Sequence, residues 1–148
     1  GAASGIPMTH REVAQAVTFI TGHGGEGGLT LDWETLAKLD HTLVIYMGVS
    51  AAAEICTNLI RHGLRKSTPV AVVGDGTTPD QKLVIGRLET LSELIVESGV
   101  TPPATIIIGD VVEHSRLEVV RFVEQVRRIN GNAAGINNQR SRLLEVGS

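Results

Sequence analysis

Aromatic side chains are scarce in this chain of 148 residues, in which Phe, Trp and Tyr together make up 3%. A hydrophobic core must therefore consist of Val, Ile, Leu and Ala, the side chains typical of buried strands that lie under helices. Apolar residues still make up 42% of the chain and charged residues 20%, as is usual for a globular protein. The length is that of one domain with enough chain to bury a core.

Cysteine is almost missing as well, since Cys56 is the only one. A single cysteine excludes an internal disulfide and a zinc site built of cysteines alone, and it fits a reducing compartment. No apolar run approaches the length of about 20 residues that a membrane-spanning helix needs, and no basic-then-apolar leader opens the chain. We expect a cytoplasmic protein with no membrane partner. Because Gly1 rather than Met opens the chain, we also expect a fragment of a longer protein.

An excess of positive charge is missing too. Lys and Arg number 13 against 16 Asp and Glu, a net charge of −3, so no long-range field attracts nucleic acid or an anionic membrane. The five histidines have no metal-ligand spacing, and we expect His41, His62 and His114 to be surface or edge residues. We therefore expect no nucleic-acid partner and no metal, and any bound anion must be held by local groups.

Apolar runs alternate with helical patterns along the chain. β-Branched and apolar runs predict strands at 17–21, 42–47, 70–73, 82–88 and 105–108. Apolar spacing and capping residues predict helices at 33–39 (capped by Asp32, with Leu36 and Leu39 inside), from Ser50 to Gly63, at 90–98 and after Asp110, and a helical turn opened by a capping box, Thr9 to Glu12. This alternation predicts a layered α/β domain.

In such a domain ligands bind at the carboxyl ends of the strands. These ends are predicted at Gly22–His23, Met47–Gly48, Gly74–Thr77 and Gly109–Asp110. The loop from Gly22 to Gly27 formally matches the G-x-G-x-x-G fingerprint of dinucleotide-binding proteins. The residues 29–31 separate it from the next helix, so no helix N-terminus lies where a pyrophosphate would need it. We interpret 22–28 as a flexible loop instead.

Three further features each allow two interpretations. Arg11 beside His10 is either a solvated cation paired with Glu12 or a planar donor fork for carboxylates. Met47 is either a core methionine or a soft wall against an adenine or a sulfonium. Gly74–Thr77 is either a simple turn or a place where the backbone approaches a ligand. Composition and periodicity leave these alternatives open.

Five segments together resemble the uroporphyrinogen-III C-methyltransferases, which are tetrapyrrole methylases. They span about 5 to 112 and are Gly5–Arg11, Val17–His23, Val44–Gly48, Pro69–Thr78 (where Gly74-Asp75 departs from the family's commoner Glu-Asn) and Pro103–Val112. The resemblance implies a layered mixed sheet flanked by helices, as in the C-terminal domain of such an enzyme. It divides the chain into a lead-in (1–16), the α/β methylase domain (17–129) and a flexible tail (130–148).

The family binds S-adenosylmethionine between two domains, and its positions carry over residue by residue. Met47 and Gly76 match cofactor-binding positions, and Arg11, His23 and Met47 match positions that meet the tetrapyrrole. This changes the interpretation of Arg11, because the substrate carries eight carboxylates that suit its donor fork. No catalytic residue is assigned, although His23 is a secondary acid–base candidate.

The resemblance implies that the parent enzyme methylates uroporphyrinogen III twice, giving precorrin-2 and S-adenosylhomocysteine, in the sirohaem or cobalamin pathway. It also implies a homodimer. The family's N-terminal glycine-rich loop is not in this chain, so we expect the chain by itself to be inactive. There are two alternatives. One is a methyltransferase of a later corrin precursor, although the residues Thr9–Arg11 and Gly22–His23 argue against it. The other is a non-catalytic α/β module used for dimerisation.

Overall fold

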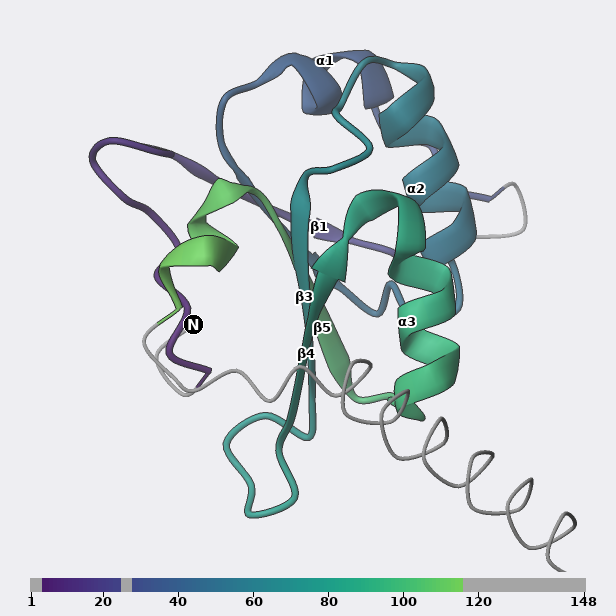
Figure 1. The fold of residues 1–148 in the computed structure, drawn as a ribbon. Coiled ribbons are helices and arrows are strands. Elements are labelled where there is room, and N and C mark those ends of the chain that lie inside the picture. Colours follow the sequence, from purple (N-terminus) through teal and green to yellow (C-terminus); the bar gives the residue numbers. More distant parts are fainter. Residues whose placement is uncertain (1–3, 25–27, 116–148) are drawn as a thin grey trace, which may run out of the picture.

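The computed structural model describes residues 4–24 and 28–115, which form one mixed α/β unit (Figure 1). Its elements are β1 (Val17–Thr21), α1 (Trp33–Lys38), β2 (Thr42–Tyr46), α2 (Ala52–Arg61), β3 (Pro69–Gly74), β4 (Lys82–Arg87), the 3₁₀ turn η1 (Leu88–Thr90), α3 (Leu91–Ser98), β5 (Ala104–Ile108) and the 3₁₀ turn η2 (Asp110–His114). The five predicted strands are confirmed to within one or two residues. The continuation beyond 115 of the predicted last helix, and the tail, lie outside the described residues.

The five strands form one sheet in the order β1-β2-β5-β3-β4. β1 and β2 are parallel, whereas β5 runs antiparallel to both of its neighbours, β2 and β3. Therefore β1, β2 and β3 all end at one edge of the sheet, where β5 begins. Gly109–Asp110 follows the end of β5 as predicted, but this strand end lies at the opposite edge of the sheet from the ends of β1, β2 and β3.

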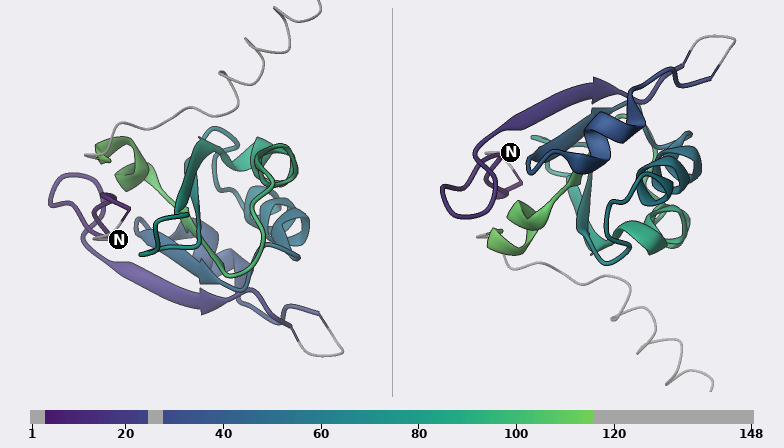
Figure 2. Two further views of the ribbon diagram at one scale, coloured as in Figure 1. Left: turned by 90° about the horizontal axis from the view of Figure 1, so that it is seen from below. Right: turned by 90° about the horizontal axis from the view of Figure 1, so that it is seen from above.

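The three α-helices all cover one face of the sheet (Figures 1 and 2). Alternate residues of the strands point toward the helices, as the two-residue period of a strand requires. Together they bury the main core, whose fully or almost fully buried members include Leu43, Ile45, Ile55, Leu59, Val70, Val72, Leu88, Leu91, Ile106 and Ile108. Each such side chain contributes roughly 1.5–3 kcal/mol by leaving water, so this layer holds the sheet in place.

The other face of the sheet has no α-helix over it in the described part of the chain. The N-terminal segment (purple in Figure 1) and η2 lie across it and bury a second, smaller cluster made of Ile6, Ala14, Ala71, Val73, Ile107, Val111 and Val112. This cluster covers only part of the face. The part over β1 and β2 stays open and forms one wall of the candidate site.

Some helix ends agree with the predictions from the sequence, and others do not. Asp32 caps α1 as predicted, since its Oδ1 accepts a hydrogen bond from the Thr35 N–H at 3.0 Å. The predicted Ser50 cap is wrong, because the N-cap of α2 is Ala51, without a side-chain cap. The predicted inner position of Leu39 is wrong, because Leu39 follows the end of α1 and is 48% exposed. Ala37 is buried there instead.

The predicted helical turn at Thr9–Glu12 is also wrong. The backbone N–H of His10 donates to the Ala14 carbonyl at 2.8 Å, and the Ala14 N–H returns a bond to His10 at 2.9 Å. These two bonds form an antiparallel bridge that closes a tight turn. None of the helices in the described residues is long and apolar enough to cross a lipid bilayer.

Candidate functional site

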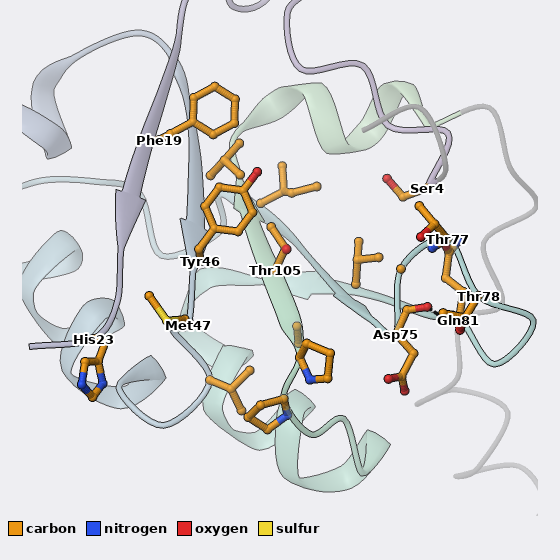
Figure 3. Close-up of a pocket in the computed structure, with 18 of the residues that line it drawn as sticks. Ser4, Phe19, His23, Tyr46, Met47, Asp75, Thr77, Thr78, Gln81 and Thr105 are labelled. Carbon is orange, nitrogen blue, oxygen red and sulfur yellow. Dashed lines mark hydrogen bonds between the residues drawn. The ribbon is translucent and has the colours of Figure 1, made fainter.

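A pocket of about 840 Å³ lies where the open face of the sheet meets the ends of β1, β2 and β3 (Figure 3). One side of it is formed by residues at and beyond the ends of β1 and β2, and the other by the loop that joins β3 to β4. The start of β5 forms its floor through Thr105 and Ile107. The topology of the sheet explains this location, because β5 runs opposite to β1, β2 and β3 and so starts at the edge where those three strands end.

The side of the pocket over β1 and β2 is apolar and exposed. Phe19 is 55% exposed, Tyr46 48% and Met47 60%, and all three line the pocket. In the parallel register Phe19 lies beside Val44, two residues before Tyr46, so the two rings are diagonal neighbours on the same face. Their centroids are 6.1 Å apart and their planes 12° apart. A flat apolar surface of this kind favours contact with a flat apolar ligand.

The loop between β3 and β4 forms the polar side of the pocket. The first residue of this loop is held through both of its backbone groups: the Asp75 N–H donates to the Pro103 carbonyl at 3.1 Å, and the Asp75 carbonyl accepts from the Thr78 N–H at 3.2 Å. The Thr78 hydroxyl donates to the same carbonyl at 2.7 Å. The Thr77 N–H donates to Gln81 Oε1 at 3.0 Å. These bonds hold the loop in a defined shape without a ligand.

Backbone strain gathers at this pocket. Met47 (φ 54°), Asp75 (φ 49°) and Thr77 (φ 72°) are the non-glycine residues with positive φ in the described part of the chain, and all three line the pocket. Each such conformation costs on the order of 1–3 kcal/mol and persists only where the surroundings impose it. The three strained residues make this pocket the candidate functional site of the described residues.

Two glycines bring the ends of β1 and β2 into contact. A Cβ on Gly22 would lie 2.4 Å from the Gly48 Cα, closer than real Cβ atoms come, and the Gly22 N–H donates to the Tyr46 carbonyl at 2.6 Å. Only a residue without a side chain fits there. The contact places His23, the second residue after β1, and Met47, the first residue after β2, at the same end of the pocket (Figure 3).

Of the residues proposed from the sequence, Met47, Gly76 and His23 are brought together around this pocket. Arg11 is not, because it lies on the exposed turn that His10 and Ala14 close. A Cβ on Gly76 would meet only Val73 Cγ1, at 3.5 Å. The backbone at Gly76 is therefore open on that side to an approaching ligand.

Sequence reasoning missed Phe19, Tyr46 and Asp75 as lining residues. In the sequence Phe19 and Tyr46 look like ordinary strand residues, because a strand pattern does not show which face of the sheet other segments cover. The Gly74–Thr77 segment was the available signal for Asp75. Within the described residues, His, Cys, Asp and Glu nowhere gather in a group of three or more that could hold a metal ion.

Comparison with known proteins agrees with this geometry. Residues 1–92 match the family of Tetrapyrrole (Corrin/Porphyrin) Methylases. A siroheme synthase of Nitrosomonas europaea is 47% identical over 115 residues, which are 77% of this chain and 24% of that protein. The chain therefore spans about a quarter of the length of the curated relatives that it matches.

Two solved structures are similar in fold. The uroporphyrin-III C-methyl transferase of Thermus thermophilus complexed with S-adenyl homocysteine matches with a TM-score of 0.63 and 37% identity, over 74% of this chain and 46% of that one. A cobalt precorrin-4 methyltransferase, a cobalamin biosynthetic enzyme, matches with a TM-score of 0.67 and 25% identity, over 75% of this chain and 47% of that one. In each case this chain corresponds to about half of the neighbour.

Proposed function

The chain belongs to the family of tetrapyrrole (corrin/porphyrin) methylases, and from this premise we propose that it supplies the C-terminal half of a site for S-adenosylmethionine-dependent C-methylation. The substrate that we propose is uroporphyrinogen III, methylated twice to precorrin-2. The siroheme synthase and uroporphyrin-III methyltransferase relatives support this choice. The main support for the proposal is that Met47, Gly76 and His23 all line one pocket, in which three residues have strained backbone conformations.

The pocket has the features that a bound S-adenosylmethionine requires. Its volume of about 840 Å³ is in the range of small-molecule sites. The Met47 side chain is 60% exposed and offers a soft, polarisable thioether, and the Gly76 backbone is open to close approach. We propose that these two residues contact the cofactor. When bound, it supplies an electrophilic methyl group on a sulfonium.

The residues of this chain then act by binding and orientation. The Phe19–Tyr46 surface and Met47 exclude water from the reacting carbon, while the hydrogen-bonded β3–β4 loop holds its shape. Such positioning lowers the barrier of a two-reactant step by removing the entropy of bringing the partners together. We propose that His23 holds a substrate carboxylate and that Arg11 holds another from outside the pocket. His23 is also the secondary acid–base candidate.

The first test uses the ¹⁵N-labelled 148-residue chain with S-adenosylhomocysteine. Nuclear magnetic resonance detects weak binding, which is what half of a site should show. We expect the Gly76 amide and the residues around Met47 to shift during the titration, whereas amides at the opposite edge, such as Gly109, stay unchanged. No shift at Gly76 or Met47 at millimolar ligand would contradict the cofactor assignment.

The second test concerns Arg11 and uses the polypeptide in which this chain follows an N-terminal methylase half. Arg11→Ala should raise KM for uroporphyrinogen III about tenfold or more, because a charge-assisted carboxylate contact contributes roughly 1.5–3 kcal/mol. Binding of S-adenosylhomocysteine should be unchanged. An unaltered KM would reject the role of Arg11.

Domain limits and assembly are part of the same proposal. We propose that 1–16 is a lead-in between domains, 17–129 the C-terminal α/β domain and 130–148 a flexible tail, and that the parent enzyme is a homodimer. The second candidate within the family is methylation of a later corrin precursor, which the cobalt precorrin-4 methyltransferase neighbour favours. Turnover of uroporphyrinogen III by the parent enzyme distinguishes the two.

A further inference from the structure

Among the described residues that line the pocket, Asp75 is the one that carries a formal charge, apart from the imidazole of His23. We propose that the Asp75 carboxylate selects the positively charged S-adenosylmethionine over its neutral product, and so makes this pocket a charge-selective cofactor site. The inference rests on the proposed function, because it assumes that the cofactor lies in this pocket. The proposal adds a specificity residue that the resemblance did not assign. At this position the family more commonly has a neutral Asn.

The loop geometry presents this carboxylate to the pocket. The backbone of Asp75 is held through its N–H by Pro103 and through its carbonyl by Thr78, and its φ of 49° is left-handed. An Asp tolerates this conformation better than most residues do. Figure 3 shows the side chain pointing away from Ser4 and Thr77. Asp75 therefore combines a strained backbone with a side chain that lines the pocket and points away from Thr77.

The charge has no partner of opposite sign among the described residues. The ion pairs that the structure shows there are Lys38 with Glu34 and Arg65 with Asp110, both away from the pocket. No Lys or Arg is among the lining residues in the part of the chain that the structure describes. An unpaired carboxylate at a partly buried site attracts a cation and repels an anion. A ligand that carries positive charge is the one that this part of the pocket fits.

The negative charge of Asp75 also favours different positions in the pocket for the tetrapyrrole substrate and for the cofactor. A substrate with eight carboxylates is repelled by Asp75, so it lies toward Phe19, Tyr46 and His23 on the opposite side (Figure 3). The cofactor has a sulfonium, which suits the side near Asp75. Methyl transfer converts this sulfonium into a neutral thioether, and the attraction to Asp75 then falls. The residue therefore favours binding of the reactant and release of the product.

The test compares two ligands of nearly equal shape. S-adenosylhomocysteine has a neutral thioether, and sinefungin has a protonated amine at the corresponding position and cannot transfer a methyl group. Their dissociation constants are measured on the 148-residue chain by titration, followed at the Gly76 amide. The variant is Asp75→Asn, which removes the charge, keeps the shape and tolerates the positive φ. The matched control is Asp80→Asn, an exposed residue of the same loop that does not line the pocket.

We expect Asp75→Asn to weaken sinefungin by about fivefold, the upper end for a partly exposed ion pair, and to leave S-adenosylhomocysteine within about twofold. The Asp80→Asn chain should behave like the wild type, and added salt should reduce the preference for sinefungin in these two chains but not in Asp75→Asn. Equal weakening of both ligands, or no change in either, overturns the inference while the cofactor assignment stands. If neither ligand shifts Gly76 in the wild type, the proposed function falls and the inference falls with it.

Discussion

Cys56 shows at the scale of one residue how burial decides chemistry. It lies on the inner side of α2, 7% exposed, and burial raises the pKa of its thiol to about 11. The thiolate is the reactive form of cysteine. Although it is the one cysteine of the chain, Cys56 is therefore a core residue and contributes nothing to the pocket.

This gives a first prediction on reactivity. At about pH 8 roughly one thiol in a thousand is ionised, given that pKa, so the folded chain should react with a thiol reagent such as Ellman's reagent far more slowly than the unfolded chain does. The measurement is the rate of colour release with and without guanidinium. Equal rates in both conditions would show that Cys56 is accessible.

His41 lies at the edge of the sheet opposite the pocket. Its Nδ1 is 3.2 Å from the Thr18 hydroxyl, and its Nε2 is buried without a hydrogen-bond partner in the described residues. Burial lowers the pKa of this imidazole below its usual 6.5, against a smaller opposing effect of Asp40. The folded chain therefore prefers neutral His41, and the unfolded chain binds its proton more readily.

The sign of the pH dependence follows from this difference. The stabilisation is present above the usual pKa of 6.5 and is lost as the pH falls below it, because the unfolded state then binds more protons. Between about pH 7.5 and about pH 5.5, the free energy of unfolding should fall more in the wild type than in His41→Gln. Urea unfolding at several pH values measures this, and parallel curves for the two chains would contradict it.

At the scale of elements, the contact between the ends of β1 and β2 shapes the site. Gly22 and Gly48 touch because neither has a side chain, and the two strands can end side by side only for that reason. His23, two residues after β1, and Met47, which follows β2, thereby reach one pocket. The positions of both proposed ligand-binding residues thus depend on a glycine that binds nothing itself.

Two glycine substitutions separate folding from binding. Gly22→Ala drives a Cβ into the Gly48 backbone and should lower the free energy of unfolding by about 1–3 kcal/mol. Gly76→Ala meets only Val73 Cγ1 at 3.5 Å, so stability should change by less than about 0.5 kcal/mol while S-adenosylhomocysteine binds more weakly. Chemical denaturation and the same titration measure the two effects. A stable Gly22→Ala chain would show that the edge can relax.

At the scale of the whole molecule, the two faces of the sheet have different tasks. Three helices seal one face into a core, while the N-terminal segment and η2 cover only part of the other (Figure 2). Three large apolar side chains stay exposed on the open part. Since the chain corresponds to about half of each solved neighbour, we propose that the other half of the methylase closes over this face.

Ligand binding should then stabilise the whole domain. At ten times its dissociation constant, S-adenosylhomocysteine should add about 1.4 kcal/mol to the free energy of unfolding, a rise in Tm of roughly 5 °C for a domain of this size. A Met47→Ala chain should show a smaller rise. Val96→Ala, which changes an exposed residue away from the pocket, is the control and should match the wild type. Differential scanning calorimetry measures the three shifts, and equal rises in Met47→Ala and the wild type would argue against a contact with Met47.

The sequence by itself determined the elements and the family. The apolar run 42–47 and the cap at Asp32 predict local structure correctly, because strand and helix patterns depend on neighbours in the chain. The resemblance also identified Met47, Gly76 and His23, which the structure brings to one pocket. These are properties that a linear motif carries.

Only the tertiary structure decided the direction of β5 and which face of the sheet stays open. Strand patterns do not encode the direction of pairing, so the sequence did not show that Gly109–Asp110 lies at the opposite edge from the other predicted strand ends. Exposure of Phe19 and Tyr46, and the strain at Asp75, likewise depend on packing between segments distant in sequence. The sequence therefore specified which residues could serve the site, and long-range packing determined which of them share the pocket.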